Sequence, residues 1–294
     1  MSQAILMAIA ADGLLSLMDA IIKSLTPRYA TFQIAFLRFA AGMIWASLLL
    51  AYLRPGWPSR ETVIYNSTRS VLIVLTATSF FYALSQLPLA DTIALAFLSP
   101  MFVALFGSMF LKERIDLRIA IALAAGFAGM LLIAGARAGS GTYTTGAIYG
   151  TAACLLSAVT YALTLVLLRA RATRDSISII VWFQNLGPTL ILAIPAALVW
   201  IAPSWQDAGI FVVIGVLGVS GHFLLAAAFA RAEAARLAPV HYTTLVWGVV
   251  FGYVFFTEIP AMATFIGASL IVLGTIATHR RSPSPTSGGE KKRV

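Results

Sequence analysis

Apolar runs of roughly 18 or more residues recur along the whole 294-residue chain, and they constrain its fold more than any other feature. Each run is long enough to cross a hydrocarbon core of about 30 Å as an α-helix. The composition agrees, because 60% of the residues are hydrophobic and 11% are charged, against about 25% charged in soluble domains. The runs are continuously apolar and do not alternate, which indicates helices and not barrel strands. The sequence therefore predicts an all-α polytopic membrane protein surrounded by a lipid bilayer.

Turn-rich segments such as RPGWPSRE and APSWQD separate the apolar runs and set the boundaries of ten expected transmembrane helices. Their expected limits are 3–23, 31–53, 69–86, 91–111, 117–136, 145–168, 177–201, 208–230, 237–256 and 261–278. The polar residues 279–294, rich in Pro, Ser and Gly, are expected to form a disordered tail. A single cysteine, Cys154, rules out an intramolecular disulfide.

Lysine and arginine are divided unequally between the two sets of connections. The connections after the even-numbered helices, together with the tail, contain 16 of the 20 Lys and Arg residues, and the other set contains three. Because cytoplasmic loops are enriched in these residues, both termini and the tail are expected in the cytoplasm. This asymmetry also explains the net charge of +9, so we expect no nucleic-acid partner.

The two halves of the chain resemble each other. Residues 89–113 read LADTIALAFLSPMFVALFGSMFLKE, and residues 236–258 read RLAPVHYTTLVWGVVFGYVFFTE. Alignment on their final glutamates places Gly107 opposite Gly252. Similarity of this kind at a long interval predicts a repeated structural unit.

The repeat predicts two five-helix units, residues 3–136 and 145–278. Because five is odd, the second unit must enter the membrane upside down relative to the first. Inverted repeats around a binding site at the membrane midplane are typical of transporters that work by alternating access. The expected fold is thus ten transmembrane helices arranged as two inverted five-helix repeats.

These residues resemble the drug/metabolite transporter superfamily, EamA type. The similarity rests on the fourth helix, with Pro100 and its closing glutamate, and on the fifth, with its spaced glycines, and it spans nearly the whole chain. Within the superfamily the sequence is most similar to the bacterial aromatic amino-acid exporters. This resemblance implies a multi-pass secondary transporter of the bacterial inner membrane that exports amino acids, hydrophobic, aromatic and other neutral ones, without a cofactor. We expect a monomer or a homodimer.

Arg38 is the one charged residue in the apolar run 32–52. A cation at the centre of a span costs about 2.5–3.5 kcal/mol on insertion scales, so we expect Arg38 to face a polar cavity or an anion. Two interpretations are open: a structural pair with Asp19, or a clamp in which Arg38, or Lys23, holds a substrate carboxylate. Asp12, nearer the midplane, is a candidate proton site if burial raises its pKa.

Polar and aromatic side chains away from the helix ends complete the candidate substrate site. Its expected members are Asp19, Arg38, Tyr82, Phe97, Tyr161, Gln184, Asn185, His222 and Trp247. Core packing is the alternative role for the aromatic residues and for His222. Prolines within the helices are expected hinges, and they are Pro100, Pro188 and Pro239. No metal site is expected.

The charges also limit the substrate class. Phosphorylated solutes generally require several arginines or lysines, and Lys23 and Arg38 are the two cations considered for the substrate cavity. A neutral or zwitterionic solute such as an amino acid fits better, and another small neutral metabolite or a drug is the alternative. The absence of a Walker motif in the sequence argues against ATP hydrolysis.

Two other classes are weighed against a carrier. One is a passive pore or scramblase. The other is an intramembrane serine protease, because GVSG at residues 218–221 contains Ser220 and the next helix contains His241. The expected depths of these two residues differ by about 10 Å or more along the membrane normal, so a transporter without enzymatic activity is preferred.

Overall fold

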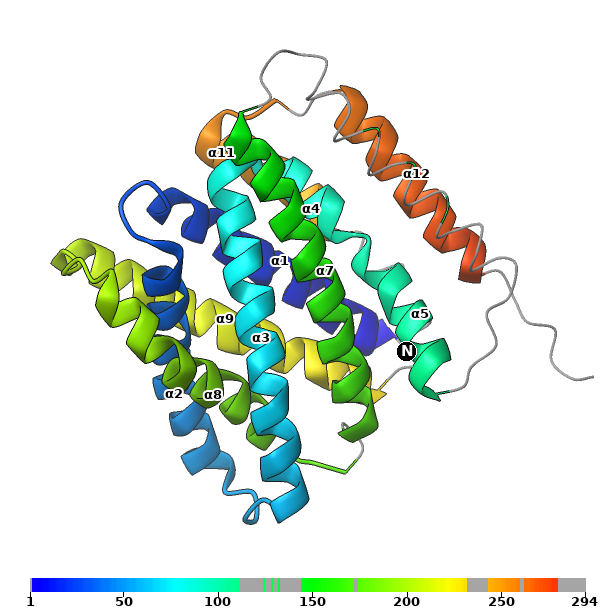
Figure 1. The fold of residues 1–294 in the computed structure, drawn as a ribbon. Coiled ribbons are helices and arrows are strands. Elements are labelled where there is room, and N and C mark those ends of the chain that lie inside the picture. The colour runs from blue at the N-terminus through cyan, green and yellow to red at the C-terminus, as the bar shows by residue number, and fades with distance from the viewer. Residues whose placement is uncertain are drawn as a thin grey trace, which may run out of the picture.

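The computed structural model describes residues 2–111, 124, 128, 132, 144–171, 174–231, 243–259 and 262–279, and every regular element among them is a helix (Figure 1). The helices are α1 (Ser2–Leu25), α2 (Thr31–Leu53), α3 (Arg60–Gln86), α4 (Leu89–Ala96), α5 (Ser99–Leu111), α7 (Thr145–Arg171), α8 (Ile177–Leu198), α9 (Trp205–Arg231), α11 (Thr243–Phe256) and α12 (Met262–His279). Six of them, α1, α2, α3, α7, α8 and α9, are long and apolar enough to cross a membrane. The described residues therefore form the all-helical polytopic architecture that the sequence predicts.

Helix α3 begins nine residues earlier than predicted, at Arg60 and not at residue 69. The side chain of Ser59 caps it by accepting a hydrogen bond from the amide of Thr62 at 3.1 Å. Its first turns are polar in sequence, yet Asn66 and Arg69 are buried because this part of α3 packs against other helices. A hydropathy window interprets such a polar stretch as a loop, which is why the predicted limit was wrong.

The single helix predicted over residues 91–111 is interrupted in the structure. Helix α4 ends at Ala96, a turn follows at Phe97 and Leu98, and α5 begins at Ser99. Pro100 lies in the first turn of α5. Because proline donates no amide hydrogen bond and disfavours the helical conformation of the residue before it, a helix boundary at this point is expected.

The other expected hinges are placed differently. Pro188 is buried inside α8, which continues through it without interruption, and Pro239 lies outside the described residues. Most of the expected helix 117–136 and of the tail 279–294, and the beginning of the helix 237–256, also lie outside them. The remaining expected limits differ from the observed ones by at most three residues.

Helices from the two halves of the chain pack mainly against each other. The largest interfaces join α1 with α9, α2 with α8 and α3 with α7, and smaller ones join α2 with α9, α3 with α8, α1 with α11 and α5 with α7 (Figure 1). Large apolar side chains such as Ile44, Leu190 and Ile194 are exposed, whereas Arg38 and Arg69 are buried. This distribution, polar inside and apolar outside, suits a bundle whose solvent is lipid.

Glycine allows two of these helices to approach closely. A Cβ atom placed on Gly215 of α9 would lie 2.7 Å from the Cβ of Ala41 and 2.8 Å from the backbone nitrogen of Gly42. The backbones of α2 and α9 are therefore in contact at this crossing, as small residues permit in membrane bundles. This contact fixes α2 against the helix that carries His222.

Candidate functional site: a buried polar cluster

The six long helices bring polar side chains together inside the bundle. We call this group the central polar cluster. Its members are Asp12 and Asp19 of α1, Arg38 of α2, Arg69 of α3, Tyr161 of α7, Gln184 of α8 and His222 of α9. Each member is linked to another by a hydrogen bond or lies within electrostatic range of it. The cluster draws on both halves of the chain, so the folded bundle as a whole positions it.

Arg38 is 4% exposed, and its guanidinium lies over the ring of Phe39, with 4.1 Å between Cζ and the ring centroid. The same guanidinium rests on the backbone of α9, where a Cβ on Gly218 would be 3.0 Å from Nη2. Asp19 is within electrostatic range of Arg38, but these two described side chains do not form an ion pair. The direct contact assumed in the structural-pair interpretation is therefore absent.

Arg69 is a member of the site that the sequence analysis missed. It is 3% exposed, and its Nη2 donates a hydrogen bond to Oε1 of Gln184 at 3.1 Å. The sequence places Arg69 in a cytoplasmic connection because the expected helix begins at residue 69. A signal was present in the sequence: Thr62, Asn66 and Arg69 are spaced as one face of a helix.

Acidic and aromatic groups lie around the two arginines. Tyr161 is within electrostatic range of Asp12, Asp19 and Arg69. Asp12 also accepts a hydrogen bond from the hydroxyl of Thr243 at 3.1 Å. The interior therefore contains two cations and two carboxylates from three helices, together with a phenol that lies near both kinds of charge.

His222 lies near both arginines. Its Nδ1 is 2.7 Å from the backbone oxygen of Gly218, one turn earlier in α9. It is within electrostatic range of Arg38 and of Arg69, so one region of α9 faces both guanidinium groups. The hydrogen bond to its own helix fits the packing role considered for this histidine.

Several guanidinium donors in the cluster have no partner. Nε and Nη1 of Arg38 and Nε of Arg69 are buried and form no hydrogen bond within the described part of the chain. An unmade hydrogen bond at a buried polar group costs about 1–3 kcal/mol, and more when the group is charged. Carboxylates match the planar fork of a guanidinium and bind it in a bidentate manner. The cluster is therefore suited to receive an anionic group of a ligand.

The other expected site residues lie outside the cluster. Asn185 is buried against Gly42, where a Cβ would be 3.2 Å from its Cγ, and it donates a hydrogen bond to the backbone oxygen of Val181 at 2.8 Å. Asn185 therefore lies at the contact between α2 and α8. Phe97 is buried in the turn between α4 and α5, and Tyr82 is half-buried on α3.

Trp247 of α11 packs against α1. A Cβ placed on Gly13 would lie 3.2 Å from Cε2 of the indole, and the indole stacks on Phe251 with 5.6 Å between ring centroids. Because Gly13 directly follows Asp12, the indole lies next to the cluster and not within it. Core packing, the alternative given for the aromatic residues, describes these contacts of Trp247.

Lys23 marks one end of the bundle, which we call the Lys23 end. Its Nζ forms an ion pair with Oε1 of Glu258 at 3.0 Å and donates a hydrogen bond to the backbone oxygen of Leu87 at 2.5 Å. Oε2 of Glu258 accepts a hydrogen bond from the amide of Leu89 at 2.8 Å and thus caps α4. Lys23 is occupied by these groups and is not placed to hold a substrate carboxylate.

Contacts of three further residues join the halves of the chain at the Lys23 end. Nη1 of Arg28 donates to Asp207 at 2.6 Å, and the hydroxyl of Tyr29 donates to the same carboxylate at 2.7 Å. This hydrogen bond to Asp207 raises the pKa of Tyr29 above its usual value. Gln33 exchanges two hydrogen bonds with the backbone of Ile201, at 2.5 and 2.9 Å. These contacts tie α1 and α2 to α8 and α9.

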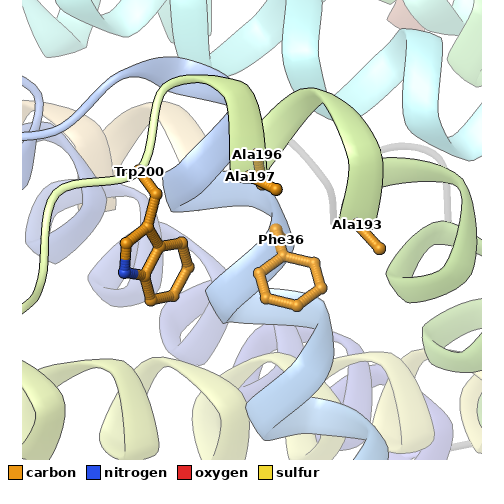
Figure 2. A pocket seen from close by; sticks show the side chains of 5 residues that line it. All are labelled: Phe36, Ala193, Ala196, Ala197 and Trp200. Atoms are coloured by element: carbon orange, nitrogen blue, oxygen red, sulfur yellow. The ribbon is translucent and has the colours of Figure 1, made fainter.

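A pocket of about 390 Å³ lies between α2 and the end of α8 (Figure 2). Phe36, Ala193, Ala196, Ala197 and Trp200 line it. Figure 2 shows the rings of Phe36 and Trp200 side by side, and their centroids are 6.2 Å apart. All lining residues are apolar and none belongs to the central polar cluster, so this pocket is an apolar depression separate from the cluster.

Within the described ranges, no group of three or more His, Cys, Asp or Glu side chains is placed to hold a metal ion. Ser220 is half-buried on α9, and His241, its expected partner in a protease, lies outside the described residues. Cys154 is buried, and its Sγ is 3.4 Å from the backbone oxygen of Thr92.

A family model and several known proteins match this chain. The model described as the EamA-like transporter family matches residues 2–135 and again residues 148–279. The chain is 32% identical over 280 residues to a protein named pseudopaline exporter from Pseudomonas aeruginosa, covering 94% of this chain and 95% of that one.

Relatives with lower sequence identity are named for other transported molecules. The chain is 26% identical to an S-adenosylmethionine uptake transporter of Rickettsia bellii, over 88% of this chain and 87% of that one. It is 28% identical to a riboflavin transporter of Rhizobium johnstonii, over 79% and 73% of the two chains. One crystal structure of a protein 25% identical in sequence superposes with a TM-score of 0.65, over 94% of this chain and 96% of that one.

Proposed function

Because this chain belongs to the EamA-like transporter family, we propose that it is a secondary transporter that exports amino acids or amino-acid-like metabolites from the bacterial cytoplasm by alternating access. The family and the relatives described above are transporters of small molecules. We propose no enzymatic step. The observation that carries the choice of substrate is the buried guanidinium of Arg38, whose Nε and Nη1 have no partner among the described residues.

Two inverted repeats of five helices are part of this proposal. The family model matches the chain twice, which supports units at residues 3–136 and 145–278. If α1, α2 and α3 correspond to α7, α8 and α9, then the α1–α9 interface corresponds to the α3–α7 interface, and the α2–α9 interface to the α3–α8 interface. Because each of these interfaces has a counterpart in the other half, the packing supports a two-fold rotational relation between the halves.

The directions of the helices support inversion. The first-half helices α1 and α3 end at the Lys23 end, while α2 and α4 begin there. In the second half, α8 and α11 end there, and α9 begins there. Gly146, at the beginning of α7, lies against the side chain of Gln86 at the end of α3, so α7 also begins there. Each helix thus runs opposite to its counterpart, as inverted repeats require.

We infer that the Lys23 end faces away from the cytoplasm. Arg69, counted with the cytoplasmic connections in the sequence analysis, lies inside the bundle, so fifteen Lys and Arg residues remain in those connections against three in the others. The positive-inside rule still places both termini in the cytoplasm. With this orientation, the contacts of Lys23, Arg28 and Gln33 close the outer end, as expected for one state of an alternating-access cycle.

An amino acid suits the chemistry of the cluster. Its carboxylate would bind the unpartnered N–H groups of Arg38, and its ammonium group would lie near Asp19, which is half-buried and within electrostatic range of Arg38. Tyr161 is within electrostatic range of Asp19 and would offer an aromatic face to an apolar substrate side chain. In this proposal Arg38 binds substrate and is not a structural partner of Asp19.

A second candidate substrate comes from similarity. The relative named pseudopaline exporter is 32% identical and matches almost the full length of both chains. Export of the metabolite in that name, or of a compound related to it, is therefore the alternative to export of free amino acids. Both candidates require the same carrier and the same direction of net transport.

Flux from liposomes tests the proposal. The purified chain would be reconstituted into liposomes loaded with all common amino acids, and mass spectrometry would measure which ones leave faster than from protein-free vesicles. We expect selective, saturable loss of a subset. Flux that does not saturate would indicate a passive pore or scramblase, and labelling of Ser220 by a fluorophosphonate would revive the protease alternative. No loss from folded protein would contradict export of free amino acids.

A further inference from the structure

We propose that the substrate carries at least two carboxylate groups, and that Arg69 holds the second one while Arg38 holds the first. This inference rests on the proposed function and narrows its substrate class. It begins from one observation: two arginines, 4% and 3% exposed, both retain buried guanidinium donors without a partner in the described part of the chain.

The two arginines lie at different distances along their helices from the loop that joins α2 and α3. Arg38 precedes the end of α2 at Leu53 by fifteen residues, and Arg69 follows the beginning of α3 at Arg60 by nine. Helices α2 and α3 are antiparallel and extend to the same side of the loop that joins them (Figure 1). The difference of six residues corresponds to about 9 Å along the helix axis at 1.5 Å per residue. Two carboxylates on one elongated molecule can therefore each meet one of the two guanidinium groups.

Both arginines face a common region. His222 is within electrostatic range of each of them, and Arg38 rests on Gly218, one turn away from this histidine in α9. Tyr161 is near Arg69 and also near Asp19, which is itself near Arg38. These links place the space between the two guanidinium groups beside α9 and α7, where a single molecule can contact both.

The acidic members of the cluster determine what accompanies the carboxylates. Asp12 and Asp19 lie in the same interior and balance the two arginines. A phosphate group would concentrate its charge near one arginine and be repelled by these carboxylates. Ammonium groups would be attracted to them. The class that fits best is therefore a zwitterion with two carboxylates and one or more amines.

One hydrogen bond already made by Arg69 is compatible with this role. Its Nη2 donates to Gln184, which orients the guanidinium and leaves Nε for a ligand. Gln184 thus acts as a positioning residue for Arg69. A side-chain amide is suited to this because it orients a guanidinium without neutralising its charge.

Two probes that differ by one carboxylate test the proposal. 2,6-Diaminopimelate has two carboxylates and two amines, and lysine is the same molecule without one carboxylate. Each would be titrated to 10 mM against the purified full-length chain in detergent, with the rise in Tm as the readout of binding. We expect the Tm to rise with the concentration of diaminopimelate, with a half-maximal effect at a concentration at least ten times lower than for lysine.

Variants assign the effect to Arg69. Arg69→Gln should lower the response to diaminopimelate to that of lysine and leave the lysine response unchanged. Arg69→Lys, which retains the charge, should restore part of the difference. Arg60→Gln is the matched control, because it makes the same change in the same helix at an exposed position, and it should behave as the unaltered chain. The Tm without ligand should not fall in Arg69→Gln, since the change removes a buried charge with an unmade hydrogen bond.

Equal responses to the two probes, or no response to diaminopimelate, would overturn the proposal. So would equal loss of both responses in Arg69→Gln, because that result indicates a structural role. The outcome is separable from that of the proposed function. Export of monocarboxylic amino acids without binding of diaminopimelate would retain the carrier and reject the two-carboxylate substrate. Binding of diaminopimelate without export of any compound would retain the two-carboxylate ligand and reject the proposed export.

Discussion

At the scale of single residues, the chain holds a buried cation by surrounding it with an aromatic ring and a bare stretch of backbone. Arg38 lies over Phe39 and against Gly218, and neither contact satisfies its Nε or Nη1. A purely structural arginine would be expected to use its donors within the protein. The unused donors favour the clamp interpretation over the structural pair.

Substitution of Arg38 tests this interpretation. Hydrogen bonds to charged groups contribute about 1.5–3 kcal/mol, so Arg38→Ala should lower the initial rate of export from liposomes by about 10- to 100-fold at subsaturating substrate. Arg38→Lys should have an intermediate effect, because an ammonium group retains the charge and loses the planar fork. Normal transport by both folded variants would reject the clamp.

The sequence permitted prediction of the residues whose chemistry contrasts with their surroundings. Arg38 and His222 stand out as polar groups in apolar runs, and both lie in the cluster. Arg69 does not stand out, because it follows a polar stretch that forms the first turns of α3. Asn185 does stand out, yet it packs against Gly42. A polar residue in an apolar run is expected to be buried. Which residue it then contacts depends on packing between helices that are distant in sequence.

At the scale of helices, hydropathy predicts neither where helices break nor where two helices cross; single residues decide both. The run 91–111 contains no charged residue after Asp91, and the break between α4 and α5 coincides with Pro100. The crossing of α2 and α9 depends on Gly215, because any side chain there would meet the backbone of α2. Composition alone gives the number of apolar runs, whereas these local features decide how they pack.

Gly215→Ala should destabilise the bundle. A Cβ at this position would lie 2.8 Å from backbone atoms of α2, and such overpacking typically costs about 1–3 kcal/mol. Gly209→Ala, in the same helix, is the matched control, because a Cβ there has no atom within 4 Å. Thermal unfolding in detergent should show a lower Tm for the first variant and an unchanged or slightly higher Tm for the second. Equal Tm values would refute the close crossing.

Two substitutions at Glu258 separate its two roles. Glu258→Gln removes the ion pair with Lys23 but retains an oxygen to accept from the amide of Leu89. Glu258→Ala removes both contacts. We expect a loss of about 1 kcal/mol for the ion pair in the first variant and a further loss of about 1 kcal/mol for the cap in the second, measured by chemical denaturation. If the two variants lose the same stability, the cap does not contribute.

At the scale of the whole molecule, the two halves of the chain are interleaved and not separate domains. Each of the three largest interfaces joins a helix of the first half to one of the second. The family model matches each half independently, so similarity between the halves could be found in the sequence. Their mutual packing could not, because near-uniform apolarity gives no preferred face to most of these helices.

Topology is the prediction that belongs to this scale. Green fluorescent protein fused after the last residue should fluoresce, and alkaline phosphatase fused there should be inactive, if the C-terminus is cytoplasmic. The same reporters inserted in the turn between α1 and α2 should give the opposite pattern and serve as the control. An active phosphatase at the C-terminus would reverse the orientation and place the Lys23 end in the cytoplasm.

Interleaving also has a consequence for how the protein is made. Helix α1 ends at Leu25, and its main partner α9 is complete at Arg231. At a synthesis rate of about 5–20 residues per second, about 10–40 s separate the emergence of the two. During that interval Asp12, Arg38 and Arg69 are in the bilayer or at the translocon without the helices that surround them in the folded state. Biogenesis of this chain therefore includes a period in which the buried polar residues of the central polar cluster lack the helices that cover them in the folded state.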